Sequence, residues 1–461
     1  MFRKARRLHF VGIGGSGMSG IAEVLVNLGY PVSGSDLVSN DATRRLKRLG
    51  ARVHRGHRAE YVRDADVVIV SSAVKQDNPE VVEARRLEIP IIPRAEMLAE
   101  LMRLKYSVAV AGAHGKTSTT GMIAEVLTEG GLDPTVVIGG RIGKLRSGAK
   151  LGRGEILVAE ADESDGSFLR MKPTIAVVTN IDREHLDHYA DLGAIQDAFV
   201  WFLSRVPFYG AAVVCVDDPN VRAILPRIDR KRIGYGLASG ADVSATDIEV
   251  REFECTYVAR RGGEKLGRIR LSVPGRHSVY NSLAAVAVGL ELDVPFRRIA
   301  GALAAFRGAD RRLQLKGRAL GALILDDYGH HPTEVVATLS AIREGFGART
   351  LVVFQPHRYS RTQALLEEFG RAFFLADQVI VTDVYAAGER PLPGISGASV
   401  AESLVRHGHP SVVYERLLAD IPKRLRAAIA PGDVVLTLGA GDVWKVGDAL
   451  LRSPASRRRR A

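Results

Sequence analysis

The chain has 461 residues and a formal net charge of +12, from 64 basic and 52 acidic side chains. At about 150 residues per domain, this length excludes a single core and predicts about three domains. Two cysteines exclude a disulfide framework, and no apolar run approaches the roughly 18 residues of a membrane span. We therefore expect a cytoplasmic protein without membrane insertion. Aromatic residues are only 6%, so the positive charge favours an anionic metabolite over nucleic acid as partner.

The first predicted domain opens with a strand over residues 8–11, a glycine-rich turn and a helix over 18–28. The turn, Gly12-Ile13-Gly14-Gly15-Ser16-Gly17, precedes Asp36 by 19 positions and so fits a dinucleotide-binding fingerprint. Physically, the fingerprint means only that a diphosphate sits on a helix N-terminus. A nucleotide sugar satisfies it as well as a nicotinamide cofactor, and a purely structural turn is the alternative.

The same α/β pattern continues to residue 104. A strand over 65–70 ends in Ser71 and Ser72, at the carboxyl end of a parallel strand, where open sheets bind their ligands. Serines at strand ends are more often caps, but these two are candidates for the group bound at the glycine turn. We place the end of this first domain in the segment 102–105.

A second glycine loop, Gly112-Ala113-His114-Gly115-Lys116-Thr117-Ser118, follows a strand over 108–111 and leads into a helix with a clear pattern from Thr120. Unpaired N–H groups and the dipole of such a helix favour phosphate at its start. Lys116 is expected to reach the β- and γ-phosphates of a nucleotide, and Thr117 to offer its hydroxyl to Mg²⁺. The common pattern has glycine at position 110, where this chain has Val110, so the loop is a variant.

Two further strand ends carry polar side chains that suit the phosphate loop. A strand over 155–159 runs into Glu160, and a strand over 174–179 is followed by His185. Mg²⁺ prefers carboxylate oxygens, so Glu160, the first acid after its strand, is the predicted ligand. The carboxyl ends of parallel strands meet at one sheet edge, where Lys116, Glu160 and His185 should converge. A solvated acidic loop and a surface histidine are the alternatives.

The pattern then changes to alternating residues. Segments 243–250, 254–260 and 268–273 predict antiparallel strands with a turn at 261–264. A helix follows to about residue 290 and carries Asn281, whose amide could bond an adenine. An exposed mid-helix asparagine without such a role is the more common case.

A third α/β domain begins near 308–313, with strands predicted over 322–325, 350–354, 378–382 and 434–438. Three of these strands end in polar segments: Asp326 to Glu334, Gln355 to Arg361, and Gly439 to Asp442. Adjacent histidines at 330 and 331 cannot easily share one tetrahedral zinc ion, and cysteines are absent there. We therefore expect substrate recognition and charge stabilisation at these strand ends.

Together these features predict an α/β protein of three domains. A Rossmann-like domain spans 1–104, a central ATP-binding domain of the phosphate-loop type with extra antiparallel strands spans 105–310, and a Rossmann-like domain spans 311–461. No serine, cysteine or lysine nucleophile stands beside a base, so a covalent enzyme intermediate is not indicated. Phosphoryl transfer from ATP to a substrate carboxylate, followed by attack of an amine, fits these residues better.

The phosphate loop resembles that of the Mur ligases, which share its shortened glycine spacing. Segments 12–18, 160–165, 326–334 and 355–362 resemble, in order, the L-alanine-adding members of this family. The resemblance covers essentially the whole chain. It implies that ATP, UDP-N-acetylmuramate and L-alanine react through an acyl phosphate in peptidoglycan precursor synthesis.

The resemblance also implies residue roles. Lys116 would stabilise the transferring phosphoryl group, Thr117, Glu160 and His185 would hold Mg²⁺ or the phosphoryl position, and His330 would be catalytic beside the muramate and alanine. The other ATP-side residues would be Gly112, Ala113, His114, Gly115, Ser118, Asn281, Arg312, Asp326 and Asp327. The nucleotide-sugar ligands would be Gly14, Gly15, Ser16, Gly17, Ser71, Ser72, Arg358 and Arg361. One departure is Ser278, where relatives usually carry asparagine.

Three rival functions remain open. A related ligase attaches a recycled tripeptide to the same nucleotide sugar, but its motif more often reads Asp-Asp-Phe-Ala-His-His-Pro than the Asp-Asp-Tyr-Gly-His-His-Pro found here. A nicotinamide-dependent oxidoreductase leaves Lys116, Thr117 and Glu160 without a purpose. A nucleic-acid ATPase leaves the polar strand ends of the third domain unexplained. The choice among L-alanine, glycine and L-serine stays open, as does that between monomer and dimer.

Overall fold

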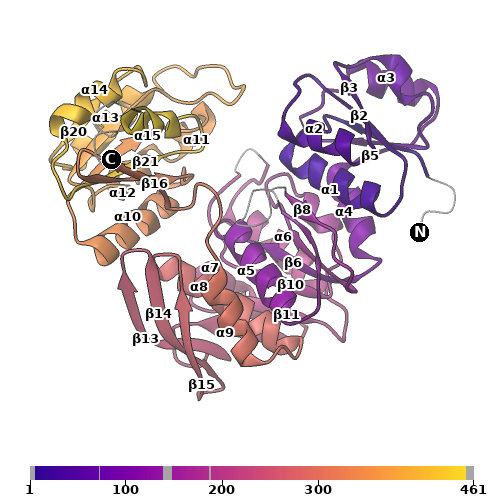
Figure 1. Cartoon of the computed structure of the whole chain (residues 1–461), viewed down its shortest axis with the longest axis horizontal. Coiled ribbons are helices and arrows are strands. Elements are labelled where there is room, and N and C mark those ends of the chain that lie inside the picture. Colours follow the sequence, from indigo (N-terminus) through magenta and orange to yellow (C-terminus); the bar gives the residue numbers. More distant parts are fainter. Residues whose placement is uncertain (1–5, 72, 139–147, 186–187, 453–461) are drawn as a thin grey trace, which may run out of the picture. The chain divides into compact units, whose positions relative to one another are not determined.

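The computed structural model describes residues 6–71, 73–138, 148–185 and 188–452, and Figure 1 labels its helices and strands. Contacts divide the chain into two compact units. The first comprises residues 1–247, 257–270 and 279–307, and the second comprises 248–256, 271–278 and 308–461. Among the described helices, none combines the length and apolar character needed to cross a bilayer.

The first unit begins with a five-stranded parallel sheet in the order β3-β2-β1-β4-β5. Its strands are β1 (Leu8–Val11), β2 (Val32–Asp36), β3 (Arg52–Arg55), β4 (Val67–Val70) and β5 (Ile91–Pro93). Its helices are α1 (Ser16–Asn27), α2 (Asp41–Arg48), η1 (Ala59–Val62), α3 (Pro79–Arg86) and α4 (Arg94–Met102). The central strand β1 is buried on both faces, since Phe10 and Val11 point into different apolar clusters.

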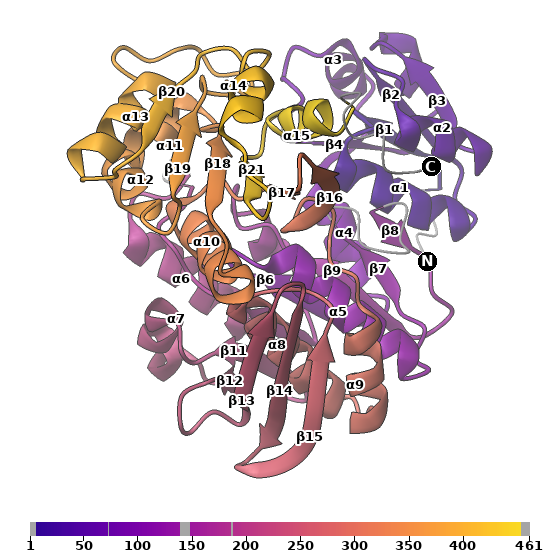
Figure 2. The same cartoon turned by 60° about the vertical axis from the view of Figure 1, so that its left-hand side comes forward.

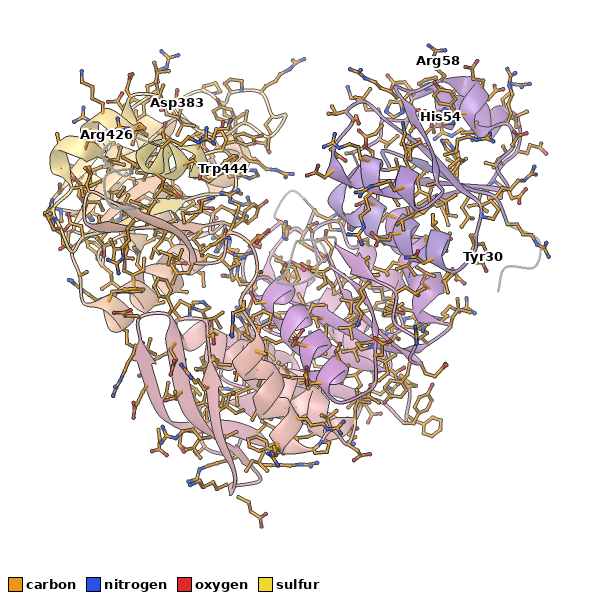
Figure 3. The ribbon with its side chains drawn as sticks, in the orientation of Figure 1. Tyr30, His54, Arg58, Asp383, Arg426 and Trp444 are labelled. Atoms are coloured by element: carbon orange, nitrogen blue, oxygen red, sulfur yellow. The ribbon has the colours of Figure 1, made fainter. Side chains whose placement is uncertain are left out.

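A buried polar network joins elements of this sheet. Glu80 is fully buried and accepts hydrogen bonds from His9 Nε2 at 2.8 Å, Ser35 Oγ at 2.8 Å and His57 Nδ1 at 3.0 Å. Its burial raises the pKa of this carboxyl, but the bonds from His9 and Ser35 outweigh that effect and leave the pKa below its ordinary value. Nearby, the ring of His54, labelled in Figure 3, stacks on Tyr61.

The central sheet has ten strands in the order β15-β14-β13-β12-β11-β10-β6-β9-β7-β8. The strands are β6 (Tyr106–Ala111), β7 (Thr135–Val137), β8 (Ala149–Lys150), β9 (Ile156–Glu160), β10 (Ile175–Val178), β11 (Ala211–Cys215), β12 (Arg232–Gly236), β13 (Val243–Arg251), β14 (Glu254–Arg261) and β15 (Glu264–Leu271). The neighbours β10, β6 and β9 run parallel, so their carboxyl ends meet at one edge. The helices are α5 (Lys116–Glu129), η2 (Ser167–Arg170), α6 (Leu192–Ser204), α7 (Pro219–Ile224), η3 (Leu225–Arg227), α8 (Arg276–Glu291) and α9 (Phe296–Ala305).

The predicted antiparallel extension is present. Two residues separate β13 from β14 and β14 from β15, a connection that only antiparallel neighbours permit. Gly262 and Gly263 both have positive φ, as the second of these tight turns requires. The last strand begins at Glu264 rather than at the predicted Arg268, because pairing with β14 extends to the turn itself.

The second unit contains a six-stranded sheet in the order β16-β17-β21-β18-β19-β20, and Figure 2 shows β17, β21, β18 and β19 side by side. The strands are β16 (Gln314–Ala319), β17 (Ala322–Asp327), β18 (Thr350–Phe354), β19 (Gln378–Val381), β20 (Val412–Tyr414) and β21 (Val434–Leu438). The helices are α10 (Pro332–Phe346), α11 (Tyr359–Ala364), α12 (Leu366–Ala372), α13 (Gly397–Arg406), α14 (Ile421–Ala428) and α15 (Trp444–Leu451). Neighbouring strands of this sheet run parallel except β16 and β17, which form an antiparallel edge hairpin that the sequence patterns did not predict. The predicted α/β class is confirmed, whereas the boundaries at 104 and 310 stay predictions.

Candidate functional site

The phosphate loop, residues 112–118, connects the buried strand β6 to helix α5 in the first unit. Gly112 and Gly115 have φ values of +133° and +80°, and a Cβ at position 115 would lie 2.6 Å from Asn281 Oδ1. Both positions therefore require glycine. The helix begins at Lys116, four residues before the apolar pattern indicates, so the N–H groups of its first turn face the loop.

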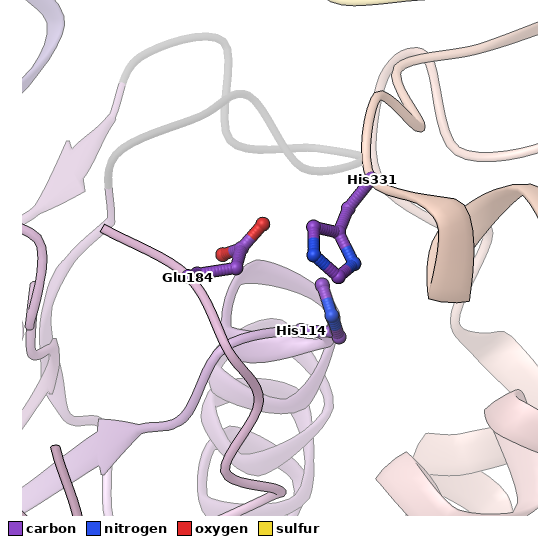
Figure 4. A group of neighbouring side chains, drawn as sticks. All are labelled: His114, Glu184 and His331. Atoms are coloured by element: carbon purple, nitrogen blue, oxygen red, sulfur yellow. The ribbon is translucent and has the colours of Figure 1, made fainter. Parts of the chain in front are cut away.

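The next strand end holds the loop backbone in place. Asn180 Oδ1 accepts the amide of His114 at 2.8 Å, and the His114 carbonyl accepts the Thr179 hydroxyl at 2.6 Å. The His114 ring contacts Asp182 Oδ2 at 3.0 Å. Figure 4 places His114 at the start of α5 and Glu184 on the segment after β10; it also labels His331, which belongs to the second unit.

Lys116 lies back against its own loop. Its Nζ donates to the carbonyls of Gly112 at 2.7 Å and Ala113 at 3.2 Å, and to Glu163 Oε1 at 2.7 Å. Burial acts to lower the pKa of this amine, but the carboxylates of Glu163 and Glu160 outweigh it and raise the pKa well above its ordinary value. The side chain is therefore a fixed positive charge at any physiological pH.

Thr117 and Glu160 meet as predicted. The Thr117 hydroxyl lies 3.1 Å from each carboxylate oxygen of Glu160, which ends the neighbouring strand β9. A hydroxyl and a carboxylate beside a phosphate loop are the oxygen donors that Mg²⁺ uses. The residues present therefore suit that ion.

His185 also reaches this edge, from the segment after β10. Its backbone has φ +57°, a strained value for a residue with a side chain, and its Nε2 lies 3.4 Å from Glu163 Oε1 and 3.5 Å from Glu184 Oε2. Ligand atoms of Glu163, Glu184 and His185 all lie within 4.8 Å of one another. The predicted convergence of Lys116, Glu160 and His185 is thus present in the structure.

Sequence reasoning missed Glu163 as a site residue. The motif has acids at positions 160, 162, 163 and 165, and the sequence pattern favours the first of them because it follows the strand directly. The turn after β9 instead directs Glu163 back to Lys116, and only 3% of this residue is exposed. The feature of the sequence that could have indicated Glu163 is the group of four acidic residues within 160–165, in the same predicted domain as the phosphate loop that contains Lys116.

The first two turns of helix α8 contain His277, Ser278 and Asn281. Asn281 is buried, and its side chain faces Gly115 of the phosphate loop. Its predicted contact with ATP stays a prediction. The Ser278 hydroxyl donates to the carbonyl of Pro274 at 2.7 Å, an internal bond that occupies its hydrogen. Burial, aided by Arg312, lowers the pKa of His277 to about 4, so this ring is neutral.

The glycine turn after β1 also forms a cradle at a helix N-terminus. Gly14 donates its amide to Asp36 Oδ2 at 2.8 Å, and Gly15 is the residue before α1. A Cβ on Gly17 would collide with the guanidinium of Arg94, whose NH2 group lies 3.5 Å from Asp162 Oδ2. Arg94 therefore supplies positive charge to a turn that has none of its own.

The other predicted residues of this domain lie close to the same turn or fall outside the description. A Cβ on Gly12 would lie 3.7 Å from Ser71 Oγ, so β4 does bring this serine to the turn. Ser16 begins α1. Ser72 lies outside the described residues.

The second unit carries Asp326 and Asp327 within strand β17, rather than after it as the sequence pattern suggested. Asp326 accepts Arg311 Nε at 2.9 Å and the Thr437 hydroxyl at 2.7 Å. Asp327 accepts two backbone amides, and burial raises its pKa to about 6 although Arg312 opposes that shift. Both carboxylates thus fix the loop around them, and a nucleotide role for them stays a prediction.

The predicted recognition residues of this unit cluster at the ends of β17 and β18. The ring of His330 lies 5.5 Å from that of His357, and Arg361 contacts His357 Nδ1 at 3.2 Å. Burial first, and then His330 and Arg361, lower the pKa of His357 to about 3. Arg358 has φ +66° and lies 4.0 Å from Glu389.

Arg312 belongs to the same region and donates to Glu334 Oε1 at 2.9 Å. The guanidinium also lies over the ring of Tyr328. The region around His330 therefore combines arginine and aromatic side chains with the carboxylate of Glu334, and its arginines are residue types suited to an anionic substrate.

Three family descriptions match the chain in order. "Mur ligase family, catalytic domain" matches residues 7–106, "Mur ligase middle domain" matches 110–289, and "Mur ligase, glutamate ligase domain" matches 311–441. A UDP-N-acetylmuramate--L-alanine ligase of Desulfatibacillum aliphaticivorans is 54% identical over 454 residues, covering 98% of this chain and 100% of that protein. One from Myxococcus xanthus is 54% identical over 449 residues, covering 97% and 95%. The chain belongs to the Mur ligase family.

Solved structures agree with this assignment. The UDP-N-acetylmuramate-alanine ligase of Thermotoga maritima matches with a TM-score of 0.80 and 30% identity, covering 96% of this chain and 98% of that one. A murein peptide ligase from Psychrobacter arcticus matches with a TM-score of 0.70 at 23% identity, with the same coverage, and so shows the fold alone.

Proposed function

We propose that this chain catalyses the ATP-dependent joining of L-alanine to UDP-N-acetylmuramate, with ADP and phosphate as the other products. The observation that carries the proposal is the convergence of Lys116, Thr117 and Glu160 at adjacent strand ends, in a chain 54% identical over nearly its full length to a protein named for this reaction. Its place of action is the cytoplasm, where peptidoglycan precursors are made.

The first step is transfer of the γ-phosphoryl group of ATP to the muramate carboxylate, which gives an acyl phosphate. Lys116 stays protonated and neutralises negative charge that spreads over the phosphoryl oxygens during transfer. The amine of L-alanine then attacks the activated carbonyl carbon, and phosphate leaves with the oxygen that joined it to carbon. This sequence needs positioning and charge stabilisation, and no covalent bond to the protein.

Thr117, Glu160 and His185 are the residues that would hold Mg²⁺. Bound there, the ion would supply positive charge that neutralises part of the charge on the phosphate groups of ATP. The donors fit it, because the hydroxyl and carboxylate lie 3.1 Å apart and His185 belongs to a group with Glu163 and Glu184 whose ligand atoms lie within 4.8 Å.

The glycine turn of residues 12–17 would bind the diphosphate of the nucleotide sugar, together with Ser71 and the guanidinium of Arg94. In the second unit, His330, Arg358 and Arg361 would contact the muramate and alanine. Support for the latter roles comes from the grouping of histidine and arginine side chains at the ends of β17 and β18. The oligomeric state is left open between monomer and dimer.

The tripeptide-adding alternative has weaker support. The murein peptide ligase structure is 23% identical, against 30% for the alanine ligase structure at higher TM-score. Phosphate release with UDP-N-acetylmuramate and, in turn, L-alanine, glycine, L-serine and the tripeptide tests the choice. We expect the highest kcat/KM with L-alanine. Equal phosphate release without any nucleotide sugar would contradict a ligase.

A further inference from the structure

The ammonium of Lys116 has no hydrogen left for a ligand. Two of its hydrogens go to carbonyls of its own loop, at Gly112 and Ala113, and the third goes to Glu163 Oε1 at 2.7 Å. The carbonyl bonds belong to the same loop as the lysine. Glu163 is different, because it comes from the segment after β9 and carries a negative charge.

Glu163 is held rigidly where it is. Its backbone carbonyl accepts the Tyr189 hydroxyl at 2.7 Å and the Gly166 amide at 3.1 Å, and only 3% of the residue is exposed. Its second carboxylate oxygen, Oε2, is buried without a hydrogen-bond partner. The loop thus fixes a buried anion against Lys116 and leaves one of its oxygens unsatisfied, an arrangement that structural ion pairs rarely retain.

We propose that Glu163 is a positioning residue that holds Lys116 in the nucleotide-free enzyme. Its carboxylate accepts the lysine hydrogen that a nucleotide phosphate would otherwise accept. This inference rests on the proposed use of ATP at the phosphate loop. A nucleotide phosphate must take Lys116 from Glu163 before the lysine can bind it. The carboxylate therefore competes with the phosphates, and only a ligand of sufficient negative charge displaces it.

Competition between Glu163 and phosphate for Lys116 predicts that removing the Glu163 charge will increase the affinity for nucleotide. Without Mg²⁺, Lys116 is the main positive partner that the loop offers to a nucleotide. Glu163→Gln keeps the shape of the side chain and removes its charge, so Lys116 becomes free to bind phosphate. We expect Mg²⁺-free ADP, titrated calorimetrically in EDTA, to bind the full-length variant about tenfold more tightly than the unaltered protein.

Asp165→Asn is the matched control. Asp165 lies on the same loop and is exposed, with its Oδ1 bonded to the amide of Ser167. The substitution removes the same charge from the same segment without touching Lys116. We expect ADP affinity in EDTA to change less than twofold, since charges in water are well screened.

A double-mutant cycle tests whether Glu163 acts through Lys116. In a Lys116→Ala background, Glu163→Gln should leave Mg²⁺-free ADP affinity unchanged. Glu163→Asp retains the charge on a shorter side chain and should give an affinity between those of the unaltered protein and Glu163→Gln. This second variant keeps the test valid if Glu163→Gln does not fold, which thermal melting will reveal.

The possible results separate cleanly. Weaker or unchanged ADP binding in folded Glu163→Gln, or a tightening that persists without Lys116, overturns the proposal. Loss of affinity confined to Mg²⁺-containing buffer would instead assign Glu163 to the ion and also overturn it. Failure of the proposed function has another signature, because the unaltered protein would then release no phosphate with UDP-N-acetylmuramate and L-alanine.

Discussion

The molecule contains two glycine-rich turns with the same strand, turn and helix order, and they differ in where their charge comes from. In the turn after β1, Asp36 accepts the amide of Gly14, and the cation beside Gly17, Arg94, comes from helix α4. In the loop after β6, Lys116 is part of the loop and faces Glu160, at the end of the neighbouring strand β9, and Glu163, in the segment that follows it. The first arrangement suits a diphosphate that is only held, and the second suits a phosphoryl group whose charge changes during reaction.

Among substitutions that test this difference between the two turns, we expect the largest effect on activity at Lys116. Lys116→Ala should lower kcat for phosphate release by about 1,000-fold, because the charge on the transferring group loses its stabilising partner. Affinity for UDP-N-acetylmuramate, measured by calorimetry, should change less than twofold. A parallel loss of nucleotide-sugar affinity would show that the two turns do not act separately.

The same substitution should also cost stability. Lys116→Ala leaves Glu163 buried without its ion-pair partner, and we expect the free energy of unfolding to fall by about 3 kcal/mol in urea titrations. Adding Glu163→Gln should recover most of that loss, since neither charge of this ion pair then remains. No recovery would mean that the lysine stabilises the loop through its two carbonyl bonds instead.

Arg94 tests the other turn. Arg94→Ala should weaken UDP-N-acetylmuramate binding about tenfold through loss of a charged hydrogen bond to phosphate. Binding of Mg²⁺-free ADP should stay the same. Arg103→Ala, at an exposed arginine that follows the same helix, is the control and should affect neither ligand. Equal losses of UDP-N-acetylmuramate affinity in both variants would mean that Arg94 acts only through the overall positive charge of the protein and makes no specific contact with phosphate.

The smallest expected effect is a pH dependence of stability in the N-terminal sheet. The pKa of Glu80 is lowered in the folded state, so its contribution is present above the unfolded value of about 4.3 and is lost as pH falls through the folded value. Glu80→Gln should therefore flatten the dependence of unfolding free energy on pH in that acidic range. An unchanged slope would place the acid sensitivity elsewhere.

The two turns also mark what sequence could predict. Each is a local pattern in which the strand, glycines and helix follow one another, so its position and the meeting of Thr117 with Glu160 could be inferred. Glu163 and Arg94 could not, because their partners depend on how a turn bends and how a distant helix packs. The sequence pattern places Asp326 after its strand, whereas pairing with both β16 and β21 extends β17 through it.

The central claim is that ATP activates the muramate carboxylate as an acyl phosphate. UDP-N-acetylmuramate labelled with ¹⁸O in that carboxylate tests it directly when it reacts with ATP and L-alanine. We predict that mass spectrometry of the released phosphate will find one ¹⁸O atom per molecule, since the bridging oxygen leaves with phosphorus. Phosphate without the label, in a reaction that still forms the alanyl product, would contradict the mechanism.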